Sequence, residues 1–224
     1  MGISDRKEKE IQIKKNDIID AAERVFFTKG YDAATMDDVA REAEFSKRTV
    51  YVYFNSKEQI YFEIMVRGYR QLIQMLESGL AERKPANAIE KMQQLSDSIY
   101  RFSQEHPDYF YAIMQYENSE QDFIKGVPAE SRDECYALGE KILGYLTGTL
   151  QWGMEEGVFL SDLDVQKTAL VLWACINGAY NTAKIKEKYL VNFHNIMPQE
   201  LVSLAFKLLL DSILVKNGGM NLEP

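Results

Sequence analysis

The sequence predicts an all-α protein with a small N-terminal domain of three helices followed by a larger helical body. In most segments apolar residues recur at positions i, i+3, i+4 and i+7, the spacing of one helix face, and almost none alternates as a strand would. Residues that begin or end helices, chiefly Ser, Thr, Gly and Pro, separate these segments. The length of 224 residues suits one small domain and one larger domain.

The first helix is expected over residues 11–30. Its apolar face comprises Ile18, Ala22, Val25 and Phe26. Gly30, which follows Lys29, is typical of the residue that ends a helix. Residues 1–10 carry mixed charges and are expected to be flexible, although Arg6, Lys7 and Lys9 could form a basic arm.

The second helix is expected to start after Thr35, because Thr is a favoured N-cap and Asp38 follows three residues later. This spacing predicts a capping box with Asp in the place of Glu. The next residues place one apolar face on the helix, formed by Met36, Val39, Ala40 and Ala43. A tight turn is expected at residues 44–45.

The third helix is expected to begin at Ser46, with Val50 and Phe54 directed at the core. The residues left on its outer side are Lys47, Arg48, Tyr51 and Val52, with Thr49 and Tyr53 at the flanks. Two short helices joined by a tight turn are the helix-turn-helix arrangement, which places its second helix in the DNA major groove.

Each outward side chain suits a particular DNA contact. Arg48 can donate two hydrogen bonds to guanine, and Tyr51 can lie against a thymine methyl group. The side chains suited to phosphate oxygens are Ser46, Thr49, Tyr53 and Lys57. Many proteins that never bind DNA also contain two short helices and a turn. The spacing alone therefore leaves a second interpretation open, in which Lys47 and Arg48 form only a solvated face.

The same region resembles the DNA-binding domain of the TetR family of bacterial and archaeal repressors, over about residues 14–66. The resemblance is carried by residues 18–43, 46–54 and 56–58, including a Gly-Tyr pair before the Thr cap and a Tyr-x-Tyr-Phe ending. It implies a homodimer in which each recognition helix binds half of a palindrome in double-stranded DNA. It also implies phosphate contacts by Thr35, Thr49, Tyr53 and Lys57, and base contacts by Lys47, Arg48 and Tyr51.

Two positions depart from the family pattern. Arg48 stands where many members have Gly, and Val52 stands where Tyr is common. Arg48 adds a long hydrogen-bond donor, so the preferred DNA sequence cannot be carried over from any relative. Val52 removes one possible phosphate contact.

The charge distribution is compatible with a DNA-binding N-terminal region. The net charge is −8, from 26 Lys and Arg against 34 Asp and Glu. Residues 1–57 hold 11 of each sign and balance to zero, so the remaining 15 and 23 give residues 58–224 the whole −8. Because the first part is not strongly basic, DNA affinity should depend on a few placed contacts and on dimerisation, and should weaken with salt.

The larger body is expected to contain six helices, at residues 56–82, 86–104, 108–117, 128–156, 164–188 and 198–216. The predicted organisation is a DNA-binding domain at 1–57, an effector-binding and dimerisation domain at 58–216, and a tail at 217–224. Aromatic and Met residues that could line an apolar effector pocket are Phe102, Phe110, Met114, Tyr136, Tyr145, Trp152 and Trp173. Such residues are also ordinary core material, and that interpretation stays open for each.

The last two long helices carry broad apolar faces. The resemblance implies that these helices pair with their twins in a dimer, with contacts by Trp173, Tyr180, Leu204 and Leu208. The alternative is that the faces pack on the subunit's own core. The predicted function is a ligand-responsive regulator, a repressor released by a small, largely apolar or aromatic effector. A DNA-bound architectural protein without an effector is the alternative.

Other classes are disfavoured by the residues present. The two His and two Cys lack metal-ligand spacing, and no phosphate-binding Gly loop or nucleophile elbow occurs. No enzyme activity, metal or cofactor is therefore expected. The sequence has no signal peptide and no apolar run that could span a membrane, which favours a cytoplasmic location.

Overall fold

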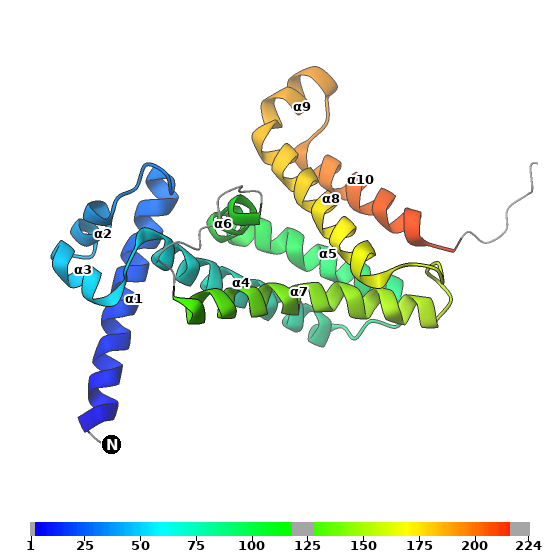
Figure 1. The fold of residues 1–224 in the computed structure, drawn as a ribbon. Coiled ribbons are helices and arrows are strands. Elements are labelled where there is room, and N and C mark those ends of the chain that lie inside the picture. Colours follow the sequence, from blue (N-terminus) through cyan, green and yellow to red (C-terminus); the bar gives the residue numbers. More distant parts are fainter. Residues whose placement is uncertain (1–2, 118–127, 216–224) are drawn as a thin grey trace, which may run out of the picture. The chain divides into compact units, whose positions relative to one another are not determined.

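A computed structural model describes residues 3–117 and 128–215 (Figure 1). The predicted tail at 217–224 lies outside these residues. The described part is all-α, as predicted. Its helices are α1 (Ile3–Lys29), α2 (Met36–Glu42), α3 (Lys47–Tyr53), α4 (Lys57–Glu82), α5 (Ala88–Glu105), α6 (Pro107–Glu117), α7 (Ala129–Glu155), α8 (Val165–Ile185), α9 (Glu187–His194) and α10 (Pro198–Ile213).

The chain divides into two compact units. Unit 1 comprises Met1–Gln71 and His106–Gly139, and unit 2 comprises Leu72–Glu105 and Glu140–Pro224. This division follows the density of packing rather than function. The predicted functional boundary after Lys57 coincides instead with the start of α4, and it stays a prediction.

Most helices begin and end close to the predicted residues, but the segment expected at 164–188 differs. There α8 ends at Ile185, and a separate helix, α9, follows from Glu187. The break lies at Lys186, whose φ of −106° and ψ of 18° are not helical. Because no Gly or Pro occurs there, the local residues contain no signal for the break.

The N-terminal residues expected to be flexible belong to α1, which begins at Ile3. Residues 6–14 of this helix are exposed along their whole length. Helix propensity and charge pairs one turn apart are sufficient to continue the helix outward from its packed half.

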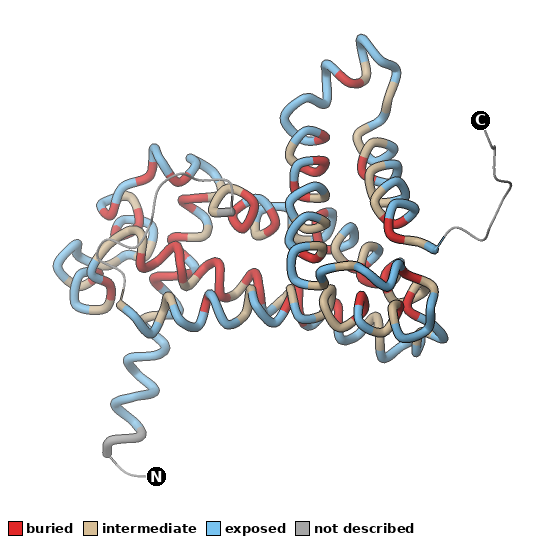
Figure 2. The backbone as a smooth tube through the Cα atoms, turned by 45° about the vertical axis from the view of Figure 1, so that its right-hand side comes forward, coloured by how far each residue is buried: buried red, intermediate tan, exposed pale blue. Residues whose placement is uncertain are grey.

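The core of unit 1 contains the residues that the sequence indicated. Phe26, Val39, Val50 and Phe54 are between 0% and 4% exposed. Tyr61 adds to this core from α4, and its ring lies 4.5 Å from that of Tyr31, centroid to centroid. Buried residues follow one side of the second half of α1, whereas residues 59–69 of α4 include no exposed position (Figure 2).

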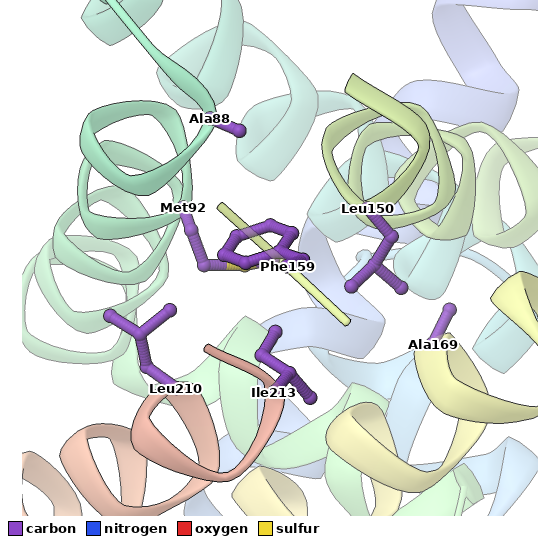
Figure 3. Packing of buried hydrophobic residues seen from close by; sticks show 7 residues of the cluster. All are labelled: Ala88, Met92, Leu150, Phe159, Ala169, Leu210 and Ile213. Atoms are coloured by element: carbon purple, nitrogen blue, oxygen red, sulfur yellow. The ribbon is translucent and has the colours of Figure 1, made fainter. Parts of the chain in front are cut away.

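Unit 2 has its own core, centred on Phe159, which is fully buried (Figure 3). The cluster around it comprises Ala88, Met92, Leu150, Ala169, Leu210 and Ile213. Gly153 allows the Phe159 ring to pack directly on the α7 backbone, since a Cβ at that position would lie 2.0 Å from the ring. In the described residues, no helix is long and apolar enough to cross a membrane.

Candidate functional site

The start of α2 is fixed by the predicted capping box. The Thr35 hydroxyl accepts a hydrogen bond from the Asp38 N–H at 3.2 Å, and the Asp38 carboxylate accepts one from the Thr35 N–H at 3.1 Å. Lys29 of α1 donates to the same carboxylate at 2.6 Å. These contacts, the Lys29 bond first, lower the pKa of Asp38 to about 2. The cap therefore joins α2 to α1 as well as starting the helix.

The turn between α2 and α3 depends on one residue in the left-handed region. Glu44 has a φ of +57°, and the next N–H, that of Phe45, donates to the Ala40 carbonyl at 2.9 Å. Ser46 then begins α3, and its hydroxyl accepts from the Thr49 N–H at 3.1 Å. The two helices are thus joined by defined hydrogen bonds at both sides of the turn.

The outer face of α3 carries the side chains predicted to reach DNA bases. Tyr51 is 45% exposed and Val52 is 71% exposed, whereas Val50 on the opposite side is fully buried. Lys47 forms an ion pair with Asp37 of α2, with 2.9 Å between Nζ and Oδ2. The exposed Arg48 forms no ion pair with any residue in the described ranges, so its guanidinium is available to a ligand.

The residues predicted to contact phosphate differ in their surroundings. Thr49 and Tyr53 are half-buried at the flanks of α3, and Thr35 and Ser46 are occupied as helix caps. Lys57, at the start of α4, donates to the backbone carbonyls of Tyr31 and Ala34. This engagement was not expected, because Lys57 is 23 residues or more from its partners and no local spacing indicates it.

One half of a capping box forms at the start of α4. The Ser56 hydroxyl accepts from the Gln59 N–H at 3.2 Å. The Gln59 side chain, however, accepts from the N–H of Asn55 at 2.7 Å rather than from that of Ser56. The bond still caps α4, one residue further back.

Unit 2 contains a cavity of about 40 Å³ enclosed by α5, α7, α8 and α10. Its lining includes Leu95, Ile99, Leu146, Trp173, Ile176 and Phe206. The hydroxyl groups of Ser96 and Tyr180 and the indole N–H of Trp173 are the polar side-chain groups among its lining residues. An apolar ligand is therefore the chemical class that fits this interior.

The predicted pocket residues are divided between the two units. Trp173 lines this cavity, but the other six do not. Phe110 and Met114 are buried in unit 1, and Tyr136, also in unit 1, is 45% exposed. The three others lie elsewhere in unit 2, which contains Phe102, Tyr145 and Trp152.

Two of those residues in unit 2 interact with charged side chains. The Tyr145 hydroxyl donates to Glu77 of α4 at 2.9 Å, and burial together with this bond raises the pKa of Tyr145 to about 12. The Trp152 ring lies beneath the ammonium of Lys91, 5.9 Å from Nζ to the ring centroid. Both rings are half-buried, and neither is directed into the cavity. Phe102, by contrast, is fully buried within unit 2.

The four residues predicted for a dimer contact also separate into two sets. Trp173 and Tyr180 line the cavity of their own subunit, and Tyr180 is only 8% exposed. Leu204 and Leu208 of α10 are 53% and 60% exposed. On α8 the exposed large apolar residues are Leu170, Val171 and Ile185. Val171 lies on the side of the helix opposite Tyr180, whereas Leu170, three residues before Trp173, lies at the edge of the inner face.

Comparison with known proteins identifies the N-terminal region. Residues 18–64 match the family model described as bacterial regulatory proteins, tetR family. This chain belongs to the TetR family. It is a DNA-binding transcriptional regulator, and the alternative of an architectural protein is not favoured. Members of this family bind DNA and dimerise, and the family is one of regulators rather than enzymes.

Similarity to TetR-family regulators extends well beyond the matched region. The chain is 25% identical over 161 residues to the HTH-type transcriptional repressor NicS of Pseudomonas putida, covering 70% of this chain and 71% of that protein. It is 28% identical over 188 residues to the Fatty acid metabolism regulator protein of Bacillus subtilis, covering 83% and 92%.

The fold is shared with a solved structure, the transcriptional regulator FadR of Bacillus subtilis in complex with stearoyl-CoA. The TM-score is 0.66 at 21% identity, covering 88% of this chain and 98% of that one. Both units of this TetR-family chain therefore have counterparts in a known regulator fold.

Proposed function

We propose that this TetR-family regulator is a dimeric repressor that binds a palindromic operator and releases it when a small, largely apolar effector binds in unit 2. The observation that carries the DNA-binding part is α3, which presents exposed Arg48 and Tyr51. The helix pair is fixed by the Thr35 cap of α2 and the Ser46 cap of α3. The proposed DNA contacts are Thr35, Ser46, Lys47, Arg48, Thr49, Tyr51 and Tyr53.

Arg48 is the proposed main determinant of operator sequence. Its guanidinium carries no internal ion pair in the described chain, so it reaches DNA without breaking one. Lys47 differs, because its bond to Asp37 raises the pKa of its ammonium and must be exchanged for a DNA contact. A bidentate arginine–guanine pair discriminates against the wrong base by about 1–3 kcal/mol.

A second copy of the chain is the proposed partner of the exposed face of α8 and α10. Between Lys167 and Lys184, α8 carries no charged residue, although Leu170 and Val171 are more than half exposed. A helix that is uncharged all round is normally covered all round. Leu204 and Leu208 add exposed apolar area on α10, and dimerisation is a property of the family.

A fatty acyl thioester is the effector class we propose. Two observations support it: the cavity lining is almost wholly apolar, and a relative 28% identical over most of both chains is a fatty acid metabolism regulator. The cavity of about 40 Å³ is far smaller than the roughly 300–1,000 Å³ of ordinary ligand pockets. Binding therefore requires its walls to move apart.

The moving walls provide a route from effector to DNA. Two of the four helices around the cavity, α8 and α10, also carry the proposed dimer face on their outer sides. Cores are closely packed, so a ligand that enlarges the cavity displaces these helices. Release of DNA needs only a coupling free energy of about 1–3 kcal/mol between the two sites.

Selection of tight binders from a random DNA library at near-physiological salt tests the DNA-binding part. Recovery of a palindrome supports a dimeric DNA-binding protein, whereas recovery of no preferred sequence by either apo or acyl-thioester-loaded protein contradicts it. Acyl-CoA compounds of increasing chain length are then titrated into the complex, with free coenzyme A as the control. Release by the long-chain compounds alone supports the effector class, and no release at any chain length contradicts it.

A pair of neighbouring variants tests the location of the effector site. Ile99→Phe fills the cavity and should reduce sensitivity to the acyl-CoA compound that releases DNA, while DNA affinity stays unchanged. Tyr100→Phe on the exposed side of α5 is the matched control and should respond as the parent does. Equal sensitivity of both variants would place the effector elsewhere.

A further inference from the structure

The side chain of Lys57, in the first turn of α4, is directed at the loop that leads into α2. Its ammonium donates to the Tyr31 carbonyl at 2.8 Å and to the Ala34 carbonyl at 3.1 Å. The same Nζ lies 4.1 Å from the centroid of the Tyr31 ring. One side chain thus holds both ends of a four-residue loop and the face of its aromatic ring.

The loop of residues 31–34 joins α1 to the cap of α2. It starts after Gly30, whose φ of +81° ends α1, and the Ala34 N–H shares its bond between the carbonyls of Gly30 and Tyr31, at 3.2 and 3.3 Å. The next residue is Thr35, the cap of α2. Any movement of the loop therefore moves the start of α2, and with it the helix pair that presents α3.

Two neighbours of Lys57 on α4 hold the same loop. The Tyr31 hydroxyl donates to the Glu58 carboxylate at 3.1 Å, and Tyr61 packs against the ring of Tyr31. Burial, followed by the nearby Glu58 charge, raises the pKa of Tyr31 well above its usual range, so the ring stays neutral and its hydroxyl remains a donor. The first turns of α4 and the loop form a single contact region within unit 1.

We propose that Lys57 is a positioning residue, which fixes the loop and the α2 cap and thereby the direction of α3, rather than a phosphate ligand. An ammonium has three N–H donors, and Lys57 uses two of them on backbone carbonyls. Turning it toward DNA would leave both half-buried carbonyls without this donor. The inference builds on the proposed DNA contact of α3 and replaces the phosphate role suggested by resemblance.

The salt dependence of operator binding separates the two roles. Each phosphate that a lysine neutralises makes the slope of log K against log salt concentration more negative by about 0.9. For a positioning residue, Lys57→Met lowers operator affinity about tenfold and leaves the slope of the parent unchanged. A phosphate ligand would instead give, on Lys57→Met, a slope smaller in magnitude by about 0.9 per subunit. A reduced slope in Lys57→Met overturns the proposal.

A double-mutant cycle with Tyr31→Leu tests whether Lys57 acts through the loop. Tyr31→Leu removes the ring and its hydroxyl but keeps the carbonyl. If Lys57 acts on this loop, its loss in the Tyr31→Leu background weakens operator binding by less than the about tenfold loss in the parent, because the ring contact is already absent while both carbonyl bonds remain. Independent, multiplying effects on affinity would overturn the proposal. Lys57→Arg, which keeps donors for both carbonyls, should recover most of the lost affinity.

Amide hydrogen exchange gives a readout that does not require DNA. In Lys57→Met the amides of Ala34 and Asp38, which belong to the loop and the α2 cap, should exchange about tenfold faster, while amides in the middle of α4 are unchanged. Unchanged exchange at both sites overturns the proposal. If the parent protein binds no specific DNA, the proposed function fails, and the exchange experiment still decides the role of Lys57.

Discussion

Two regions of the molecule are stabilised by different interactions: the helix-turn-helix of α2 and α3 (the reader) and unit 2 (the body). In the reader, short polar bonds fix each helix end: Thr35 and Asp38 cap one helix, and Ser46 caps the other. In unit 2 the central contacts are apolar and surround Phe159. Polar caps have narrow geometric requirements, whereas apolar packing allows side chains to rearrange at similar volume.

This difference matches what each region has to do in a ligand-controlled regulator. A reader must keep its side chains in register with bases, so directional bonds suit it. A body that admits a ligand into a cavity of about 40 Å³ must change volume, so adjustable apolar contacts suit it. The same body leaves Leu204 and Leu208 exposed, and the reader exposes Arg48 and Tyr51. Each region thus presents the chemistry of its proposed partner.

The largest expected effect comes from the exposed face of the body. Leu204→Glu combined with Leu208→Glu places like charges on the proposed dimer face and should give monomers. Because two linked readers bind more tightly than one by about 10²–10⁴-fold, operator affinity should fall by that factor. Sedimentation and DNA titration measure both quantities. A double variant that stays dimeric would show that these leucines serve another surface.

The next largest effect concerns the core of the body. Phe159→Ala should lower the free energy of unfolding by about 3–5 kcal/mol, because a fully buried ring is removed and a cavity remains. Chemical denaturation measures the loss. At low temperature, where the variant is folded, the preferred DNA sequence should be that of the parent. A changed sequence preference would mean that the reader and body are not separable in function.

Arg48→Ala should have a smaller effect, confined to the reader. It should cost about 1–3 kcal/mol per contact and relax the preference at one base position in each half-site. The thermal unfolding temperature should not change, since Arg48 makes no ion pair in the described residues. Repeating the library selection with the variant tests this. An unchanged preferred sequence would remove Arg48 from the base-reading set.

The smallest effect is a pH dependence of the α2 cap. The folded-state pKa of Asp38 is about 2, below its ordinary value of 3.8, so the ionised carboxylate stabilises the fold. Its contribution is fully present above about pH 4 and is lost as the pH falls through 2. Asp38→Asn should therefore be less stable than the parent at pH 6, and the gap should narrow toward pH 2. A gap independent of pH would contradict this.

Local sequence predicted the reader more fully than the body, and the reason lies in the range of the interactions. Thr35 with Asp38, and Ser46 with the Thr49 N–H, are three residues apart, so these partners can be paired directly from the sequence. The periodicity that indicated Phe26, Val39, Val50 and Phe54 is equally local. The break at Lys186 was missed because the backbone changes direction there without a Gly or Pro.

The side-chain directions in the body were harder to predict because α8 carries no charged residue between Lys167 and Lys184. Periodicity then cannot tell the inner side of the helix from the outer side. Trp173 and Tyr180 line the cavity of unit 2, whereas Leu170 and Val171 are exposed. The aromatic residues proposed for one pocket are distributed over both units, since aromatic content by itself carries no information on which helices meet.

The sequence by itself determined the all-α class, the helix-turn-helix with its caps, the residues of its core and the outward side of α3. These follow from hydrogen bonds and periodicities that span a few residues. Only the tertiary structure decided the partners of Lys57 and Asp37 and the inner face of α8, because each depends on a contact with another element of the fold. Lys57 meets its carbonyl partners 23 and 26 residues earlier, across a loop whose conformation no local pattern specifies.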